Sequence, residues 1–372
     1  MEDKIIYMPC DTVEAFMRDA FVAAGVPAED AALCANVLIS ADKRGIDSHG
    51  VGRLCSFYLD RIRDGVQQAV TQVEFVRKSG ATAVVDGHAG MAMVVAKKSM
   101  EYAMECARKY GVGIVAVRNS SHFGRAGYYA DLAAKEGMIG FCVTNARPAI
   151  APTFSTQNVL GTNPIAFTMP SDEAFPFAFD CATSVAQRGK IELYGRLGKE
   201  LPPGWVIDVE GKTRTDTQGI LADLMKSRAA LAPLGGIGEE GAGYKGYGFA
   251  TVVELLSSAL QQGYFLSQLT GFAADGSKQS PRIGHFVMAI NIENFTDLAS
   301  FKKHVGNVLR EIRSARKAPG KDRIYTAGEK EYLTLLEREK KGIAINTALR
   351  KMMLKVKADY KLDNWTLPFT EA

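Results

Sequence analysis

Two short stretches of the sequence combine histidine, serine and glycine in a way that is typical of ligand-binding loops. RGIDSHGVGR contains Ser48, His49 and Arg53, and NSSHFG contains His122. Arginine holds a carboxylate through two parallel charge-assisted hydrogen bonds, and histidine exchanges a proton near neutral pH. Glycine allows the backbone to approach a small ligand closely. The pattern therefore predicts a site that holds a carboxylic acid beside a proton donor, as hydride transfer to a 2-oxo acid requires.

A structural hydrogen bond is the alternative role for each histidine taken alone. The functional interpretation is favoured because two such loops occur and because Arg44 and Arg53 flank the first histidine. Ser48 and His49 are sequence neighbours, whose side chains normally point apart, so a hydrolase with a nucleophile–base pair is disfavoured. The five histidines show no metal-ligand spacing, and no metal site is predicted.

One glycine-rich stretch, GIGEEG at positions 236–241, matches the dinucleotide-binding fingerprint by its letters. No strand is expected before it, and Glu239 and Glu240 stand where a pyrophosphate would have to bind. The stretch is therefore interpreted as a loop, and the sequence predicts no Rossmann domain.

The elements that must position the histidine loops are predicted to be helices at both ends of the chain, with helices and strands between them. Helices are expected over 11–25 and 27–45, so that the first histidine lies in the turn that follows the second helix. Short β-branched segments separated by polar turns indicate strands from about residue 68, and the stretch 244–263 indicates a buried helix. From residue 297 onward the chain is predicted to be mostly helical and charged.

Length and composition describe a globular protein with room for two domains. The 372 residues carry a formal charge of only +4, and no nucleic-acid partner is expected. The longest apolar stretch is interrupted by Glu254, Gln261 and Gln262, which argues against a membrane partner or a membrane span. Six scattered cysteines and an acidic N-terminal segment without an apolar core favour free thiols in a cytoplasmic protein.

Five segments together resemble the malate/L-lactate dehydrogenase family, which has the L-sulfolactate dehydrogenase-like fold. They are RGIDSHGVGRL, RNSSHFGRAGYYA, TNARPAIAPTFSTQNVLGTNPIAFTMP, FDCATSVAQRGKIELYGRLGKELPPGW and GYKGYGFATVVELLSSAL. The resemblance implies a mixed α/β fold that binds NAD, with NADP as the alternative, without a Rossmann domain. It implies a homodimer, a helical substrate and dimerisation domain over 1–118 plus 305–372, and a cofactor-binding domain over 119–304. The implied reaction interconverts a small 2-hydroxy acid and its 2-oxo acid, of the malate or lactate type.

The resemblance also assigns roles to individual residues. His49 matches the family's proton donor, with Ser48 beside it, and His122 is the alternative acid/base. Arg53 matches the carboxylate clamp, and His122 and Thr162 match further substrate contacts. The implied cofactor contacts are Asp180, Thr183, Ser184, Lys245, Gly246, Gly328 and Glu329.

Two departures from the family pattern concern the substrate. Cyclic imino-acid reductases carry an aspartate where this chain reads Gln187-Arg-Gly-Lys190, which favours a hydroxy acid over an imine. Arg147 stands where small polar residues are common, and it is either a contact for a second carboxylate or a solvated side chain. The alternative activities within the family are those of ureidoglycolate dehydrogenase and of a reductase of the delta1-piperideine-2-carboxylate type. A catalytically silent binding protein on the same fold is the alternative of another class.

Overall fold

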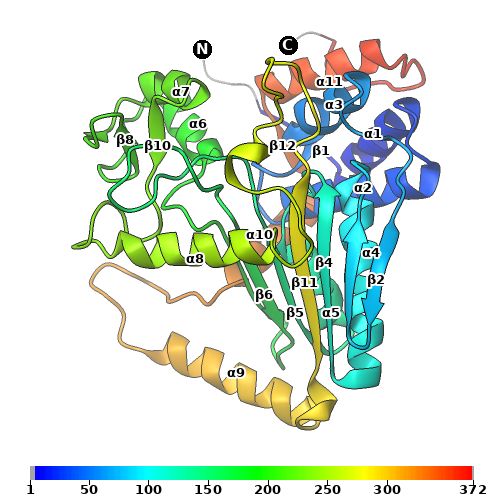
Figure 1. The fold of residues 1–372 in the computed structure, drawn as a ribbon, viewed down its shortest axis with the longest axis vertical. Helices are drawn as coiled ribbons and strands as arrows, with labels where there is room; N and C mark the ends of the chain where they lie inside the picture. The colour runs from blue at the N-terminus through cyan, green and yellow to red at the C-terminus, as the bar shows by residue number, and fades with distance from the viewer. Residues whose placement is uncertain (1–4, 371–372) are drawn as a thin grey trace.

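A seven-stranded mixed sheet forms the centre of the molecule, whose structure, a computed structural model, describes residues 5–370 (Figure 1). In sheet order its strands are β2 (Glu74–Ser79), β3 (Thr82–Asp86), β4 (Val112–Ser120), β11 (Ile283–Asn291), β5 (Met138–Thr144), β6 (Ile165–Met169) and β7 (Phe177–Cys181). Within the described chain β3 and β4 are the only parallel neighbours in this sheet. The sheet therefore combines parallel and antiparallel neighbours and differs from the doubly wound parallel sheet of a Rossmann domain, which the sequence did not predict for this chain.

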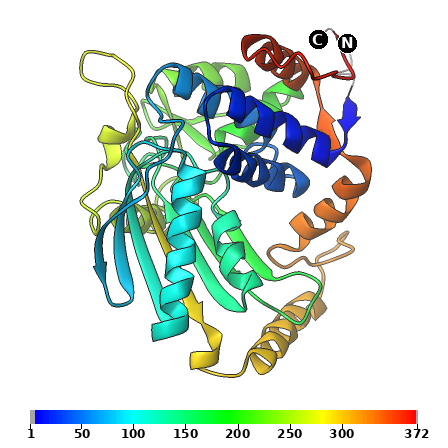
Figure 2. The same ribbon diagram turned by 90° about the vertical axis from the view of Figure 1, so that its right-hand side faces the viewer.

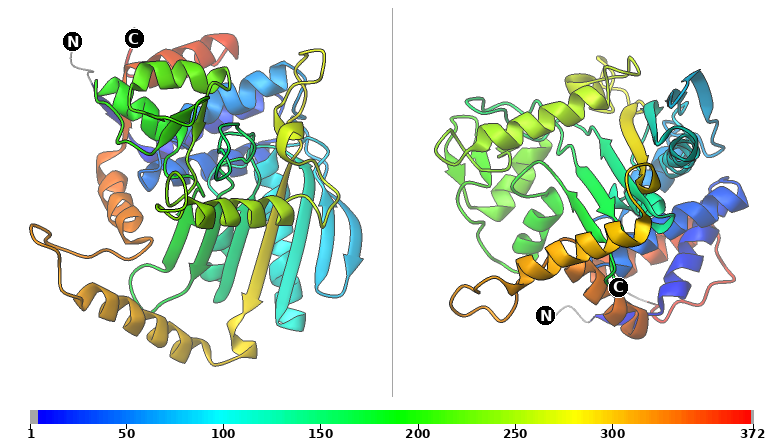
Figure 3. Two further views of the ribbon diagram at one scale, coloured as in Figure 1. Left: turned by 60° about the vertical axis from the view of Figure 1, so that its left-hand side comes forward. Right: turned by 90° about the horizontal axis from the view of Figure 1, so that it is seen from below.

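Helices cover both faces of the sheet (Figures 2 and 3). α4 (Ala92–Tyr110) and α5 (Gly127–Lys135) pack on one face, and α8 (Gly243–Leu256) crosses the other. α4 and α5 come very close to the strands because glycines face them. A Cβ atom on Gly113 or Gly140 would lie 1.9 Å or 2.2 Å from a helix carbonyl oxygen.

The two ends of the chain form a helical layer at one end of the sheet (Figure 2). It contains α1 (Cys10–Ala23), α2 (Ala28–Lys43), α3 (Asp60–Arg63), α10 (Glu329–Lys341) and α11 (Thr347–Asp359). β1 (Ile6–Met8) pairs with β12 (Ile343–Ile345) and joins the two ends. A 3-10 turn (Val51–Arg53) and a π-helical turn (Leu54–Leu59) connect α2 to α3. Phe16, Phe21 and Tyr58 are fully buried in the core of this layer.

A smaller unit lies beside the sheet and has an apolar core of its own. Its strands β8 (Val206–Asp208), β9 (Thr213–Arg214) and β10 (Ala229–Leu231) pair antiparallel, and its helices are α6 (Arg188–Arg196) and α7 (Thr217–Met225). Short 3-10 turns occur at Leu266–Leu269 and Ile292–Asn294. α9 (Leu298–Ser314) runs along the far end of the sheet before the chain returns to α10 (Figure 1).

Most of the predicted elements are confirmed, but two interpretations need correction. α8 was predicted to be buried, whereas Phe249, Val252 and Leu255 on its outer face are 55%, 52% and 56% exposed. GIGEEG does follow a strand, since β10 ends at Leu231, although that strand belongs to the small sheet. The division into two domains remains a prediction. Within residues 5–370, every helix is too short or too polar to cross a membrane.

Candidate active site

The sheet topology brings the ends of two strands, and the loops that follow them, to one edge. β4 and β5 both pair antiparallel with β11, so they run in the same direction and their carboxyl ends lie together. His285 of β11 joins these ends, because its two ring nitrogens lie 2.8 Å from Ser120 Oγ and 2.8 Å from Thr144 Oγ1. The loop after β4 carries His122, and the loop after β5 carries Arg147.

The two histidines predicted from the sequence lie side by side. The ring centroids of His49 and His122 are 5.7 Å apart with an angle of 20° between the ring planes. Burial lowers the pKa of His49 to about 4, with a further contribution from the guanidinium of Arg53. Burial, His49 and nearby arginines lower the pKa of His122 well below its usual range. Both imidazoles are therefore neutral at pH 7 in the free protein.

The hydrogen bonds around His122 determine which ring nitrogen carries the proton. Tyr58 Oη lies 2.6 Å from His122 Nδ1, and the backbone N–H of Gly124 donates to the same nitrogen at 3.4 Å. A backbone N–H can only donate, so Nδ1 is an acceptor. Tyr58 is fully buried, and donation to Nδ1 gives its hydroxyl hydrogen a partner. The neutral ring thus carries its hydrogen on Nε2, where it can donate to a ligand.

Two guanidiniums, those of Arg53 and Arg61, lie against the ring of Phe57 beside the histidine pair. The Arg53 and Arg61 guanidinium carbons lie 4.7 Å and 5.0 Å from the centroid of the Phe57 ring, which lies 4.8 Å from the His122 ring. Arg53 Nε donates to the carbonyl oxygen of Ser48. Within residues 5–370 neither guanidinium forms an ion pair with a carboxylate. An anionic ligand is the natural partner for this uncompensated charge.

The loop that carries Ser48 and His49 is bound by the buried carboxyl group of Asp42, whose pKa burial raises to about 8. Asp42 Oδ2 accepts a hydrogen bond of 2.7 Å from the backbone N–H of Val51. A Cβ atom on Gly50 would lie 1.8 Å from Asp42 Oδ1, so only glycine fits at this position. Arg338 of α10 binds the carbonyl oxygen of Asp42 and the carboxylate of Asp47. The expectation that the neighbouring side chains of Ser48 and His49 point apart is wrong, because Ser48 Oγ lies 2.8 Å from His49 Nδ1.

A cavity of about 300 Å³ lies between the helical layer and strands β6 and β7. Its lining includes the cations Arg44, Lys135 and Lys302, the aromatic residues Phe175, Phe179 and Tyr332, and the predicted cofactor contacts Asp180 and Gly328. Asp180 Oδ2 accepts a hydrogen bond of 2.8 Å from the backbone N–H of Gly127, and burial raises its pKa. Since Arg44 and Ile46 also line the cavity, the first histidine loop borders both the cavity and the histidine pair.

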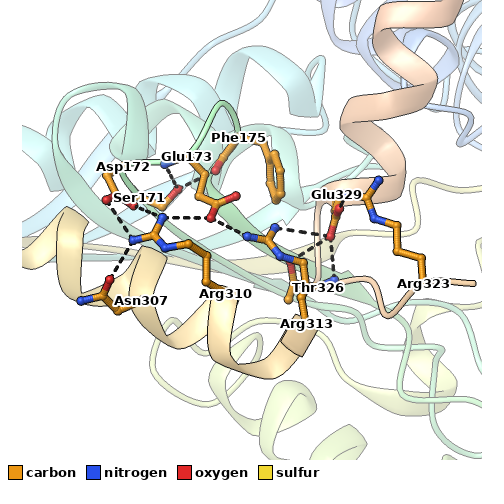
Figure 4. Close-up of polar contacts among 10 residues, drawn as sticks. All are labelled: Ser171, Asp172, Glu173, Phe175, Asn307, Arg310, Arg313, Arg323, Thr326 and Glu329. Carbon is orange, nitrogen blue, oxygen red and sulfur yellow. Dashed lines mark hydrogen bonds and ion pairs between the residues drawn. The ribbon is translucent and has the colours of Figure 1, made fainter. Parts of the chain in front are cut away.

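Glu329, another predicted cofactor contact, is fully buried in a cluster of charged residues (Figure 4). Its Oε2 accepts a hydrogen bond of 3.1 Å from the backbone N–H of Thr326 and lies 3.6 Å from Arg313 Nη1. Arg323 binds its other oxygen, and Arg313 also binds Glu173. The cluster connects α9, the turn between β6 and β7, and the start of α10. In this structure the carboxylate of Glu329 thus stabilises one wall of the cavity.

The other predicted contacts gather where β7 ends and α8 begins. The hydroxyl of Thr183 donates to the carbonyl oxygen of Thr162 at 3.1 Å. Ser184 forms a β-bridge with Pro233, and the backbone N–H of Leu234 donates to Thr183. Gly246 packs on Leu234, because a Cβ atom there would lie 2.3 Å from its carbonyl oxygen. Lys245 is exposed beside Gly246 at the start of α8.

The sequence interpretation missed Tyr58 and Arg61 as site residues. It placed Tyr58 on the apolar face of a helix, where the residue indeed packs, but did not foresee that its hydroxyl bonds His122. The signal for Arg61 was its position four residues after Phe57, which in a helix places two side chains on the same face. No group of histidine, cysteine, aspartate or glutamate side chains arranged like metal ligands occurs among residues 5–370.

Comparison with known proteins assigns this fold and site to a class of oxidoreductases. The family model for malate/L-lactate dehydrogenase matches residues 8–353, so the chain belongs to the malate/L-lactate dehydrogenase family. The malate dehydrogenase of Pyrococcus abyssi is 42% identical over 345 residues, which are 93% of this chain and 92% of the relative. The (2R)-3-sulfolactate dehydrogenase (NADP(+)) of Chromohalobacter salexigens is 34% identical over 75% of this chain and 79% of its own.

Solved structures agree with this assignment. The crystal structure of malate dehydrogenase from Entamoeba histolytica superposes with a TM-score of 0.94 at 42% identity, covering 98% of this chain and 100% of that one. The sulfolactate dehydrogenase from Methanocaldococcus jannaschii superposes with a TM-score of 0.84 at 33% identity, covering 97% and 99%. The L-sulfolactate dehydrogenase-like fold predicted from the sequence is therefore confirmed.

Proposed function

We propose that the chain is a NAD(P)-dependent dehydrogenase that interconverts a small 2-hydroxy acid and its 2-oxo acid, with a histidine as acid/base. The observation that carries the proposal is the pair of neutral imidazoles, His49 and His122, beside the unpaired guanidinium of Arg53. Arg53 binds the carboxylate of the acid, and the adjacent imidazole donates to its oxo oxygen. The malate and sulfolactate dehydrogenases among its relatives support an acid of this kind.

The cavity beside the first histidine loop fits one half of a nicotinamide cofactor. Four carboxylates also line the cavity, but Asp131 and Glu173 are paired with arginines, and burial raises the pKa of Asp180. Arg44, Lys135 and Lys302 therefore outnumber the remaining Glu331 and supply positive charge for the phosphates. Gly328 leaves space that a Cβ atom would fill, 2.9 Å from Ala178 Cβ. The bound cofactor supplies the hydride to the carbonyl carbon. The cofactor in the name of the Chromohalobacter salexigens relative supports this class of ligand.

His122 is the proton donor in this proposal, in preference to His49. Its Nδ1 accepts from Gly124 and Tyr58, so its Nε2–H is available to the substrate. The negative charge of a bound acid offsets Arg53 and Arg61, which lower the pKa of His122 in the free protein. Substrate binding therefore favours the imidazolium, whose Nδ1–H then donates to Tyr58 while the Nε2 proton passes to the substrate oxygen.

The decisive experiment is an assay of NADH and NADPH oxidation with a panel of 2-oxo acids and one cyclic imine. Turnover of at least one oxo acid with either cofactor is the expected result. Turnover of the imine alone would replace the proposal by an imine reductase, and cofactor binding without turnover of any compound would indicate a binding protein.

Replacing Arg53 by lysine tests the carboxylate clamp. Lysine keeps the charge but loses the two-pronged geometry, so binding of the oxo acid should weaken by about 1.5–3 kcal/mol, or roughly ten- to a hundred-fold. The Kd of NAD(P)H should stay within about two-fold, because Arg53 does not line the cavity. Titration of each ligand into the Arg53→Lys protein measures both effects, and equal losses for the two ligands would contradict the clamp.

We further propose a homodimer, with the outer face of α8 in the interface. Phe249, Val252 and Leu255 form an exposed apolar strip along this helix. Such a strip on a monomer costs free energy in water and is typical of a surface that meets a partner. The family resemblance implies that the partner is a second copy.

The replacement Val252→Asp tests this interface. It should raise the Kd of the dimer by at least about ten-fold, since a buried carboxylate without a partner is costly. Val70→Asp is the control, because Val70 is 69% exposed in a loop. Sedimentation at several concentrations measures both variants. A wild-type protein that sediments as a monomer while fully active would refute the dimer.

A further inference from the structure

Arg61 is a charged side chain beside the histidines that the proposed reaction does not use. Its guanidinium carbon lies 5.0 Å from the centroid of the Phe57 ring, and the guanidinium carbon of Arg53 lies 4.7 Å from the same centroid. Its Nη1 is buried and has no hydrogen-bond partner within the described chain. A buried, charged N–H donor without an acceptor is costly, so native proteins nearly always provide a partner. The orientation of Arg61 is explained if an anionic ligand supplies that acceptor.

Arg147 brings a second guanidinium to the same place from the loop after β5. The root of this loop is rigid, because the backbone N–H of Ala146 donates to Asn163 Oδ1 at 3.1 Å and Asn163 donates to the buried Glu254 at 2.9 Å. Arg147 itself is exposed and lies close enough to Arg61 to contribute, after burial, to lowering the pKa of that residue. Neither guanidinium forms an ion pair within residues 5–370, and they repel one another.

The charges in the site can be compared with those of the possible substrates. A monocarboxylic 2-oxo acid such as pyruvate brings one negative charge, which Arg53 takes in the proposed function. Arg61 and Arg147 then keep their positive charges without partners. A second carboxylate on the same molecule would give both of them a partner, and two guanidiniums bind one carboxylate well because each offers several N–H donors.

We infer that Arg61 and Arg147 form a subsite for a second carboxylate and make the protein selective for dicarboxylic 2-oxo acids. The inference rests on the proposed function, in which Arg53 holds the carboxylate next to the reacting carbon. Arg61, next to Phe57, is the contact with the buried Nη1, and Arg147 is the exposed one. Residue 147 thereby becomes a specificity-determining position that a single substitution can address.

The test compares kcat/KM for oxaloacetate and pyruvate in the wild-type protein and in three variants. Arg147→Gln should lower kcat/KM for oxaloacetate roughly ten-fold while the value for pyruvate stays within about two-fold. Arg61→Gln should lower the value for oxaloacetate roughly ten-fold more than the value for pyruvate, since Arg61 also acts on the pKa of His122. Arg108→Gln, which removes the same charge from an exposed side chain of α4, is the control and should leave the ratio of the two substrates unchanged. Because Arg147 is exposed, its variant decides the matter even where Arg61→Gln does not fold.

Equal losses for oxaloacetate and pyruvate in Arg147→Gln, or no loss for either, would overturn the subsite. Calorimetric titration with malate and lactate separates this failure from a failure of the proposed function. Malate binding that Arg147→Gln weakens selectively, in a protein that turns over no oxo acid, would support the subsite and refute the dehydrogenase. Turnover of oxo acids with no preference for oxaloacetate in the wild-type protein would refute the subsite alone.

Discussion

Replacing His122 by alanine should lower kcat for reduction of the oxo acid by roughly 10²–10⁴-fold, the usual contribution of a positioned general acid. The size of the effect follows from the hydrogen bonds at Nδ1, which leave Nε2–H as the donor that faces the ligand. KM should change little, because Arg53 and not His122 carries the charge that binds the acid. Single-turnover measurements with saturating cofactor would separate the chemical step from product release.

His49→Ala is the matched variant, since it removes the neighbouring imidazole from the same site. Its effect on kcat should be at least ten-fold smaller than that of His122→Ala, if His122 is the acid. The reverse order would return the role of proton donor to His49, the residue first matched to it from the sequence. Wild-type rates in both variants would make the histidine pair structural.

The lowered pKa of His122 has a consequence for the oxidation direction, in which Nε2 must accept the proton of the substrate hydroxyl. The ring must then be neutral, with its hydrogen on Nδ1 and donated to Tyr58. In the free protein burial holds the pKa below the usual 6.5, so the ring stays neutral as the pH falls to that value. The value of kcat/KM for oxidation should therefore stay constant from pH 8 to pH 6.5 and fall only below it. A decline that begins near pH 7.5 would require another group.

The parts of the site that could be predicted from the sequence are those with a local signal. Glycine, histidine and arginine lie close together along the chain in the first loop, and Gly50 is where a Cβ atom would meet Asp42. Helix periodicity likewise placed α1 and α2, because their apolar residues repeat along one face. In both cases the residues that interact are near in sequence.

The features that could not be predicted depend on contacts between distant segments. Tyr58 reaches His122, 64 residues later, only because the chain forms a π-helical turn over Leu54–Leu59. An ordinary helix would change the direction of every later side chain. The exposed strip of α8 was missed for a related reason. An apolar sequence indicates a buried helix, and only the packing in the folded structure shows that one face of α8 stays exposed.

The contacts of Glu329 likewise join segments that are distant in the sequence. Their loss should have a large effect on the stability of the protein. The family resemblance implies a cofactor contact for Glu329, which stays a prediction. Its charged neighbours could not be predicted, because Arg313 comes from α9 and Glu173 from the turn between β6 and β7 (Figure 4). Burial raises the pKa of Glu329, but the backbone N–H of Thr326 and the two arginines outweigh it and hold the pKa below its usual range. The carboxylate is therefore charged, fully buried and paired, and its removal leaves Arg313 and Arg323 short of a counter-ion.

Glu329→Gln should lower the free energy of unfolding by roughly 3–4 kcal/mol, the lower part of the range for breaking a buried ion pair, because Arg323 is half exposed. The stabilisation is fully present above the unfolded-state pKa near 4.5 and is lost as the pH falls through the lower folded value. Urea unfolding at pH 7 measures the difference from wild type. NAD(P)H binding should weaken as well, because Gly328 lines the cavity. Glu311→Gln, an exposed change on α9, is the control, and equal urea midpoints for both variants would show that the cluster contributes nothing to stability.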